Sequence, residues 1–368
     1  MIPNSRGGRG PRIIRYLPIL IAIIFFVVVG VRAGCQSEGM PLEPEISSEN
    51  PTSVEAVGPV TETAQSGGDV AADRERDPRD ARSGNRLQVH FIDVGQGDAI
   101  LIMGESANIL IDGGPRAAGD SIVNYLHERG IEFLDLIVAS HPHEDHIGGV
   151  LAVFEHFPVN TVLDAGVPHT TATFDRYLTH LERLVNEGDT RYLTAEGQTL
   201  TFGNVTVEVL GPASEYDCLN DNSVVCRVTF DQISFLFTGD MEREAELDLL
   251  RSERNIEADV LKVSHHGSSS STSDEFLRAV SPAHAVICVG EDNPYGHPSI
   301  EVLERLSGFA VRVHRTDSSG TLVFESDGDS VTVSDERDNG HRFNFFIARA
   351  TKWITTTISA GLGNPFRW

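Results

Sequence analysis

Three histidines and one aspartate fall within six residues of the chain, at His141, His143, Asp145 and His146. Neutral imidazole and carboxylate are the ligands that Zn2+, Mn2+ and iron prefer in proteins. A polar loop that is rich in histidine by chance is the alternative, and four ligand-type residues at this density make it a poor one. The segment therefore predicts a metal site.

The metal segment follows residues 134–139, an apolar run that is typical of a buried strand. Other polar groups stand in the same position, each at the C-terminal end of a predicted strand. These groups are Thr238-Gly239-Asp240, His265-His266-Gly267 and Tyr295-Gly296-His297-Pro298. Because predicted helices separate many of the strands, residues 87–337 are expected to form one α/β (α+β) domain.

The first 86 residues differ in composition from this domain. Arg6, Arg9, Arg12 and Arg15 precede an apolar stretch over residues 17–31. Residues 1–35 are therefore expected to be a signal peptide or a membrane anchor. Residues 36–86 are rich in Glu, Ser, Pro, Gly and Thr, which predicts a disordered acidic linker.

Two forms of membrane attachment remain open. Ala33-Gly34-Cys35 resembles the end of a lipoprotein cleavage box, whereas Arg32 replaces the aliphatic residue of that pattern. A lipoprotein and an uncleaved signal anchor both place the domain outside the cytoplasm, attached to the bacterial cell membrane. Residues 338–368 are a basic, aromatic tail, for which a short amphipathic helix on a membrane or packing against the domain is expected.

The net charge limits the choice of partners. The chain carries 54 acidic and 29 basic residues, a formal net charge of −25. Such a surface repels polyanions at long range and does not support non-specific binding of nucleic acid. Phosphate binding would therefore depend on a local basic patch or on the metal. Nothing in the sequence indicates the oligomeric state.

Five motifs together resemble the metallo-β-lactamase fold, in particular the C-terminal domain of the competence protein ComEC and its stand-alone relatives. They span residues 87–333 in the order expected for that family. The motifs are Phe91-Ile92-Asp93-Val94-Gly95-Gln96-Gly97-Asp98, the loop from His141 to Gly149, Asn220-Asp221-Asn222-Ser223, Phe237-Thr238-Gly239-Asp240, and Lys262-Val263-Ser264-His265-His266-Gly267 followed by Tyr295-Gly296-His297-Pro298. The resemblance implies an αββα sandwich and a metal-dependent hydrolase.

The resemblance also implies two divalent metal ions, most often Zn2+, with Mn2+ as the alternative. Its ligand set gives His141 and His143 to the first ion, and Asp145, His146 and His265 to the second, with Asp240 as a bridge. The usual third histidine of the first site has no evident counterpart. His156, His169 and His180 occur in the relevant interval, none directly at a strand end, so the number of bound ions stays open.

The chemistry implied by this site is hydrolysis by a metal-bound hydroxide. Asp145 is expected to orient the nucleophile as well as to bind metal, and His297, or else His266, to protonate the leaving group. A phosphodiester in DNA or in an envelope polymer is the expected substrate. A non-catalytic, metal-stabilised envelope binding module and a hydrolase of another envelope ester are the alternatives.

Two further side-chain predictions depend on burial. Cys218 and Cys226 flank the Asn-rich loop and are candidates for a disulfide in an oxidising exterior. Lys262 precedes the last histidine motif, where it either faces phosphate or is solvated.

Overall fold

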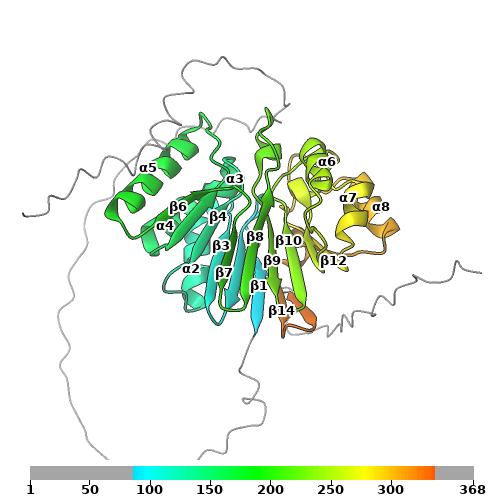
Figure 1. The fold of residues 1–368 in the computed structure, drawn as a ribbon, viewed down its shortest axis with the longest axis horizontal. Coiled ribbons are helices and arrows are strands. Elements are labelled where there is room, and N and C mark those ends of the chain that lie inside the picture. The colour runs from blue at the N-terminus through cyan, green and yellow to red at the C-terminus, as the bar shows by residue number, and fades with distance from the viewer. Residues whose placement is uncertain (1–85, 336–368) are drawn as a thin grey trace, which may run out of the picture. The chain divides into compact units, whose positions relative to one another are not determined.

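The computed structural model describes residues 86–335 and arranges their strands in two sheets (Figure 1). The first sheet has eight strands in the order β15-β14-β1-β2-β3-β4-β5-β6. Its members are β1 (Leu87–Phe91), β2 (Ile100–Gly104), β3 (Ala107–Ile111), β4 (Leu136–Ala139), β5 (Thr161–Asp164), β6 (Arg191–Thr194), β14 (Leu322–Ser326) and β15 (Val331–Asp335). Strands β3 to β6 run parallel, and the remaining pairs are antiparallel.

The second sheet has seven strands in the order β13-β12-β11-β10-β9-β8-β7. Its members are β7 (Thr199–Phe202), β8 (Val205–Gly211), β9 (Val225–Phe230), β10 (Ile233–Phe237), β11 (Val260–Lys262), β12 (His284–Ile287) and β13 (Arg312–Arg315). Strands β10 to β13 run parallel, as β3 to β6 do in the first sheet. Every residue of β10 is buried, because both faces of this strand are covered.

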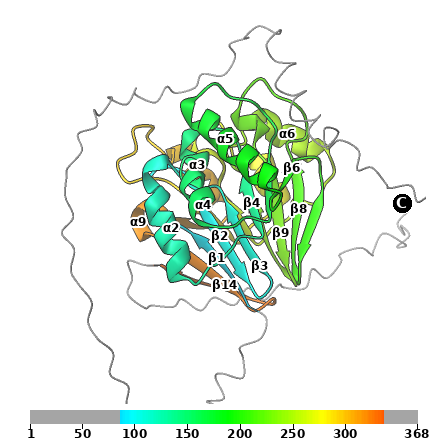
Figure 2. The ribbon, with the colours of Figure 1, turned by 90° about the vertical axis from the view of Figure 1, so that its left-hand side faces the viewer.

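Helices cover the outer face of each sheet. The helices are α2 (Gly119–Glu128), α3 (Glu144–Ile147), α4 (Val150–His156), α5 (Ala172–Glu187), α6 (Arg243–Arg251), α7 (Asp274–Val280), α8 (Ile300–Gly308) and α9 (Thr316–Ser319). Figure 2 shows α2, α4 and α5 against the first sheet, and one apolar cluster joins their inner faces to it. A second cluster joins α6, α7 and α8 to the second sheet.

The largest apolar cluster lies between the two sheets. Phe91 of the first sheet packs against Phe237 of the second, and Phe324 against Phe235, with ring centroids 6.1 and 6.3 Å apart. Two sheets that face each other with helices outside form four layers. The predicted αββα sandwich is therefore the observed fold of the described residues.

Most predicted elements occur near their expected positions. Helix α5 shows why, since Thr171 caps its N-terminus and Gly188, at φ 91°, ends it. Strands β6 and β7 were not predicted, because partly exposed side chains give them no clear alternation. The helical segment that follows the metal ligands is divided, because α3 ends at Ile147 and α4 begins at Val150.

The predicted membrane segment, the linker and the C-terminal tail lie outside the described residues, apart from Arg86 at the end of the linker. Within residues 86–335, none of the helices has the length and apolar character needed to cross a membrane.

Candidate metal centre

The predicted metal loop joins β4 to α4 and lies where the two sheets meet. The Val224 amide donates to the Ser140 carbonyl at 2.8 Å, which ties the second sheet to the start of this loop. Asp240 follows β10, and the His265-His266 pair follows β11. The ends of β4, β10 and β11 thus bring residues more than 120 positions apart to one place.

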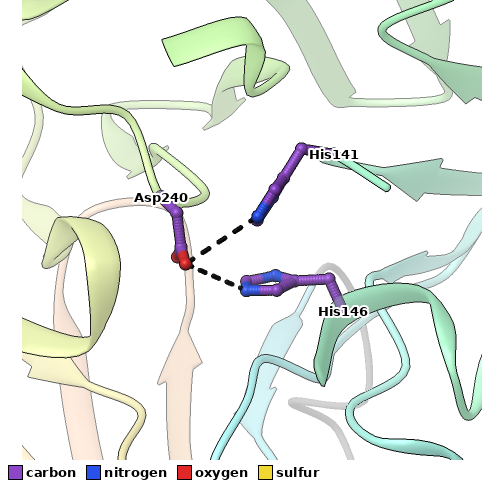
Figure 3. Close-up of side chains that lie close together, drawn as sticks. All are labelled: His141, His146 and Asp240. Carbon is purple, nitrogen blue, oxygen red and sulfur yellow. Dashed lines mark ion pairs between the residues drawn. The ribbon is translucent and has the colours of Figure 1, made fainter. Parts of the chain in front are cut away.

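Four potential ligand atoms converge there. His146 Nε2 lies 3.2 Å from Asp240 Oδ2 and 3.8 Å from Asp145 Oδ2. His266 Nε2 lies 3.3 Å from each of the same two carboxylate oxygens. Figure 3 shows the rings of His141 and His146 pointing toward the Asp240 carboxylate.

This group fits a metal ion. Ligand atoms about 2.0–2.2 Å from a tetrahedral ion lie about 3.3–3.6 Å from one another, close to the distances found. The Nε2 atoms of His146 and His266 are buried without a hydrogen-bond partner. Buried polar atoms are rarely left in that condition, so the chemistry of the donor set accommodates a divalent ion.

The other ring nitrogen of each imidazole is already occupied. Nδ1 of His146 lies 2.8 Å from Asp112 Oδ2, and Nδ1 of His266 lies 2.8 Å from the Cys288 carbonyl oxygen. A carbonyl or carboxylate at Nδ1 holds the proton on that nitrogen and leaves Nε2 as the metal-binding atom. Asp112 also accepts from the Ser140 amide at 2.7 Å, so this carboxylate positions the whole metal loop.

The backbone at the last histidine pair is strained. His265 and His266 both adopt left-handed conformations, with φ of 49° and 51°. Such conformations cost non-glycine residues about 1–3 kcal/mol and persist at functional sites. This turn directs the His266 ring into the cluster and the His265 ring toward the surface.

His141 and His143 form a second group beside Asp240. Nε2 of His141 lies 2.9 Å from Nδ1 of His143 and 3.9 Å from Asp240 Oδ2. Asp240 therefore stands between this pair and the cluster that contains His146 and His266. The arrangement suits the bridging position that the family resemblance gives it.

His265 lies apart from the ligands with which the sequence grouped it. Its Nε2 is 4.0 Å from Asp240 Oδ2, whereas its Nδ1 is 3.3 Å from Glu242 Oε1. The Asn220 side-chain amide lies 3.5 Å from Nε2 and also donates to Glu242. The geometry therefore favours His266 over His265 as the partner of Asp145, and Glu242 is a site residue that the sequence did not indicate.

His297 borders the site without entering the ligand cluster. Its ring stacks on Tyr295 and meets the His265 ring edge-on, with centroids 5.7 Å apart. Burial, followed by the nearby His265 and His266, lowers the pKa of His297 to about 4. The ring is consequently neutral near pH 7 in the substrate-free site.

The electrostatic field of the cluster favours cations. Burial opposes the charged form of His146 and His266, yet the carboxylates around them, Asp240 foremost, raise both pKa values well above the ordinary value. Asp240, despite its own burial, has a pKa well below the usual range because of these imidazoles and Lys262. A field that retains protons on buried imidazoles equally favours a divalent ion in their place.

Lys262 is neither solvated nor free to face a phosphate. Its side chain is fully buried, and Nζ lies 2.5 Å from Asp98 Oδ2 and 2.8 Å from the Gly239 carbonyl oxygen. Burial opposes its charge, but Asp98 and Asp240 raise the pKa of Lys262 above its ordinary value. The prediction for Lys262 was wrong because sequence gives no measure of depth: the residue forms a buried ion pair behind the metal cluster.

No disulfide joins Cys218 to Cys226 in the structure. The Cys226 side chain is buried in the apolar cluster between the sheets, and burial raises the pKa of its thiol to about 12. The Asn-rich loop is stabilised instead by Asn222, whose side-chain amide donates to the carbonyl oxygens of Tyr216 and Cys218.

An αββα sandwich with this donor set at the strand ends defines a metallo-hydrolase type of domain. Residues 92–291 match the model of the metallo-beta-lactamase superfamily. The chain belongs to this superfamily, whose members are usually metal-dependent hydrolases.

Comparison with curated proteins finds that the chain is similar to competence proteins. The chain is 31% identical over 256 residues to ComE operon protein 3 of Bacillus subtilis, covering 64% of this chain and 33% of that protein. It is 33% identical over 244 residues to competence protein ComA of Neisseria gonorrhoeae, covering 65% and 32%. The chain thus spans about a third of the length of these relatives. Among solved structures, the metallo-beta-lactamase fold protein YhfI from Bacillus subtilis is 15% identical with a TM-score of 0.45, covering 66% of this chain and all of that one.

Proposed function

We propose that this protein is a two-metal phosphodiesterase that cleaves DNA. The observation that carries the proposal is the convergence of Asp145, His146, His266 and Asp240, whose ligand atoms lie 3.2 to 3.8 Å apart. The Nε2 atoms of both imidazoles are buried there without a hydrogen-bond partner. Divalent ions in such a set supply water activation and stabilise the charge on phosphoryl oxygens.

The protein's own residues have distinct parts in this proposal. Asp240 presents the same oxygen, Oδ2, to both imidazole groups, and Asp145 orients the nucleophile from the edge of the cluster. Asp112 and the Cys288 carbonyl fix the tautomers of His146 and His266. Because Nδ1 of His266 contacts the Cys288 carbonyl oxygen and its Nε2 belongs to the proposed ligand set, His297 is favoured over it as the proton donor to the leaving group. A bound anionic phosphodiester would raise the pKa of His297 from its low value.

The choice of DNA rests on the competence relatives and on the intact donor set. The net charge of −25 opposes long-range attraction of a polyanion, which keeps a phosphodiester in an envelope polymer as the second candidate. A metal-stabilised binding module without catalysis is the alternative from another class.

We further propose that residues 1–35 attach the domain to the outer side of the bacterial membrane, as a lipoprotein or an uncleaved anchor.

The test uses the purified full chain with Zn2+ or Mn2+. Single-stranded DNA, double-stranded DNA and bis(p-nitrophenyl) phosphate are offered to the wild type, to Asp240→Asn and to Asp329→Asn. Asp329 is exposed in the turn between β14 and β15, so its variant is a matched control for the loss of one carboxylate. We expect Asp240→Asn to lower cleavage at least about 100-fold, because it alters the central ligand, while Asp329→Asn retains wild-type activity.

The outcomes separate the candidates. Cleavage of the p-nitrophenyl diester without cleavage of either DNA would favour the envelope phosphodiester. Full metal occupancy with no turnover of any ester would refute the enzyme and support the binding module. For the location, a Cys35→Ala variant that stays in the membrane fraction would identify an anchor, whereas its release would identify a lipoprotein.

A further inference from the structure

Tyr295 and His297 form a stacked pair of rings at the border of the proposed metal centre. The ring planes lie 23° apart, with centroids separated by 5.8 Å. The loop that carries both rings follows β12, a parallel neighbour of β11, so it leaves the second sheet at the same edge as His265 and His266. Neither the metal binding nor the proton transfer proposed above uses the Tyr295 ring, which therefore needs another explanation.

Three rings extend outward from the metal centre. Nε2 of His265 lies 4.0 Å from Asp240 Oδ2. The His265 ring meets the His297 ring edge-on, with centroids 5.7 Å apart, and His297 in turn stacks on Tyr295. All three side chains of this ring series (His265, His297 and Tyr295) are half-buried. A substrate phosphate held at the metal centre would thus have its adjoining nucleoside beside these rings.

Hydrogen bonds within the loop hold the outer rings in place. The Asn293 side chain donates to the carbonyl oxygens of Gly290 and His297, at 3.0 and 2.7 Å, and accepts from the His297 amide at 3.0 Å. At the end of the loop, the Ser299 amide donates to the Gly267 carbonyl oxygen at 2.8 Å. A surface that is fixed before binding loses little conformational entropy when a ligand stacks on it.

The surroundings of Tyr295 suit nucleobases better than phosphates. Pro294 and Ile300, which flank Tyr295 in the sequence, are exposed apolar residues, and Ile300 is 62% exposed. Glu291 and Asp292 are also exposed in this loop, and their carboxylates would repel a phosphate group. The net charge of −25 gives phosphates little further attraction, so affinity for DNA has to come from the metal centre and from the faces of the bases.

We propose that Tyr295 is a base-stacking residue, on whose ring a nucleobase next to the scissile phosphodiester lies. This inference rests on the proposed cleavage of DNA and names the form of DNA that the site accepts. A base has to leave the stack of a duplex before it can lie on a side chain, so the site should prefer single-stranded DNA. Because every base has an aromatic face, no strong sequence preference is expected.

The experiment measures binding separately from cleavage. The full chain, loaded with Mn2+, is titrated with a single-stranded decamer that carries one central 2-aminopurine and phosphorothioate linkages, which slow hydrolysis. Quenching of the 2-aminopurine fluorescence reports stacking of that base, and the anisotropy of a terminal dye gives the dissociation constant. A decamer of the same backbone without bases is the matched ligand.

The variants are Tyr295→Ala, Tyr295→Phe and Phe133→Ala. Phe133 is an aromatic residue that is 42% exposed and precedes β4, at the end of that strand opposite the metal loop, so its variant is the matched control. Thermal unfolding checks that each variant is folded.

We expect Tyr295→Ala to bind the decamer at least about fivefold more weakly and to lose most of the quenching, because one stacked base contributes about 5- to 150-fold in affinity. Tyr295→Phe keeps the ring and should bind within about twofold of the wild type, as should Phe133→Ala. All four proteins should bind the decamer without bases alike.

Unaltered affinity and quenching in Tyr295→Ala would overturn the assignment. An equal loss on the decamer without bases would also overturn it, since Tyr295 would then act only by orienting His297. Failure of the Mn2+-loaded wild type to bind the decamer would have the same consequence. Quenching that depends on Tyr295, without cleavage of unmodified DNA, would instead refute only the proposed hydrolysis.

Discussion

The buried ion pair between Lys262 and Asp98 makes a sharp prediction about stability. Both side chains are at most 1% exposed, and Nζ lies 2.5 Å from Oδ2. Replacing Lys262 by Met removes the nearest positive charge and leaves the buried Asp98 carboxylate with only the imidazoles of His266 and His146, whose Nδ1 atoms lie 3.4 and 3.8 Å from it. Breaking a buried pair from one side costs about 3–5 kcal/mol, whereas removing both charges costs much less.

The assay is equilibrium unfolding in urea at pH 7 with EDTA, so that bound metal does not contribute. We expect Lys262→Met to lose about 3–5 kcal/mol of unfolding free energy, and Asp98→Asn/Lys262→Met to recover about 2 kcal/mol or more of that loss. Arg251→Met, at an exposed residue of α6, is the control and should change stability by less than about 0.5 kcal/mol. A loss under about 1 kcal/mol for Lys262→Met would show that the charges are not coupled. So would a double variant whose loss of unfolding free energy equals the sum of the losses for Lys262→Met and Asp98→Asn alone.

Three other perturbations test parts of the site and the fold. Asp112→Asn should weaken binding of one Mn2+ ion about 10–100-fold by freeing the neighbouring imidazole, and unchanged affinity in dialysis would contradict that role. Gly97→Ala should cost about 2 kcal/mol or more, because φ is 135° and a Cβ would overlap the Asp145 carbonyl oxygen, and an unaltered urea midpoint would refute this. Burial lowers the pKa values of His284 and His314 from 6.5 to about 4, so the unfolded chain binds more protons below pH 6.5. Stability should therefore fall between pH 6.5 and 4, by on the order of 1–3 kcal/mol, and His284→Gln should lose less over that interval than the wild type.

The local order of elements was determined by the sequence itself. Apolar runs such as 134–139 and 233–237 indicate buried strands, because a strand covered on both faces has no polar side to alternate with. The cluster of His141, His143, Asp145 and His146 likewise needs no fold to suggest a metal, because its members are neighbours in the chain. Distant Asp240 joined this group only through the family resemblance.

The choice between adjacent residues was decided by the tertiary structure. Sequence cannot tell which of His265 and His266 enters the cluster, because the answer depends on two left-handed backbone conformations and on the Cys288 carbonyl. Nor can it show that Lys262 is buried against Asp98, since the two are 164 positions apart and meet only when the sheets pack.

His169 shows the same limit most directly. By spacing alone it is a loop histidine without a strand end beside it, and the pairing of β4 with β5 is what brings its ring to His143. Residue types and short spacings thus determined the kind of chemistry and the class of fold. The ligand set itself depends on which strand ends lie side by side. Sheet packing decides this, and it cannot be predicted from a local sequence pattern.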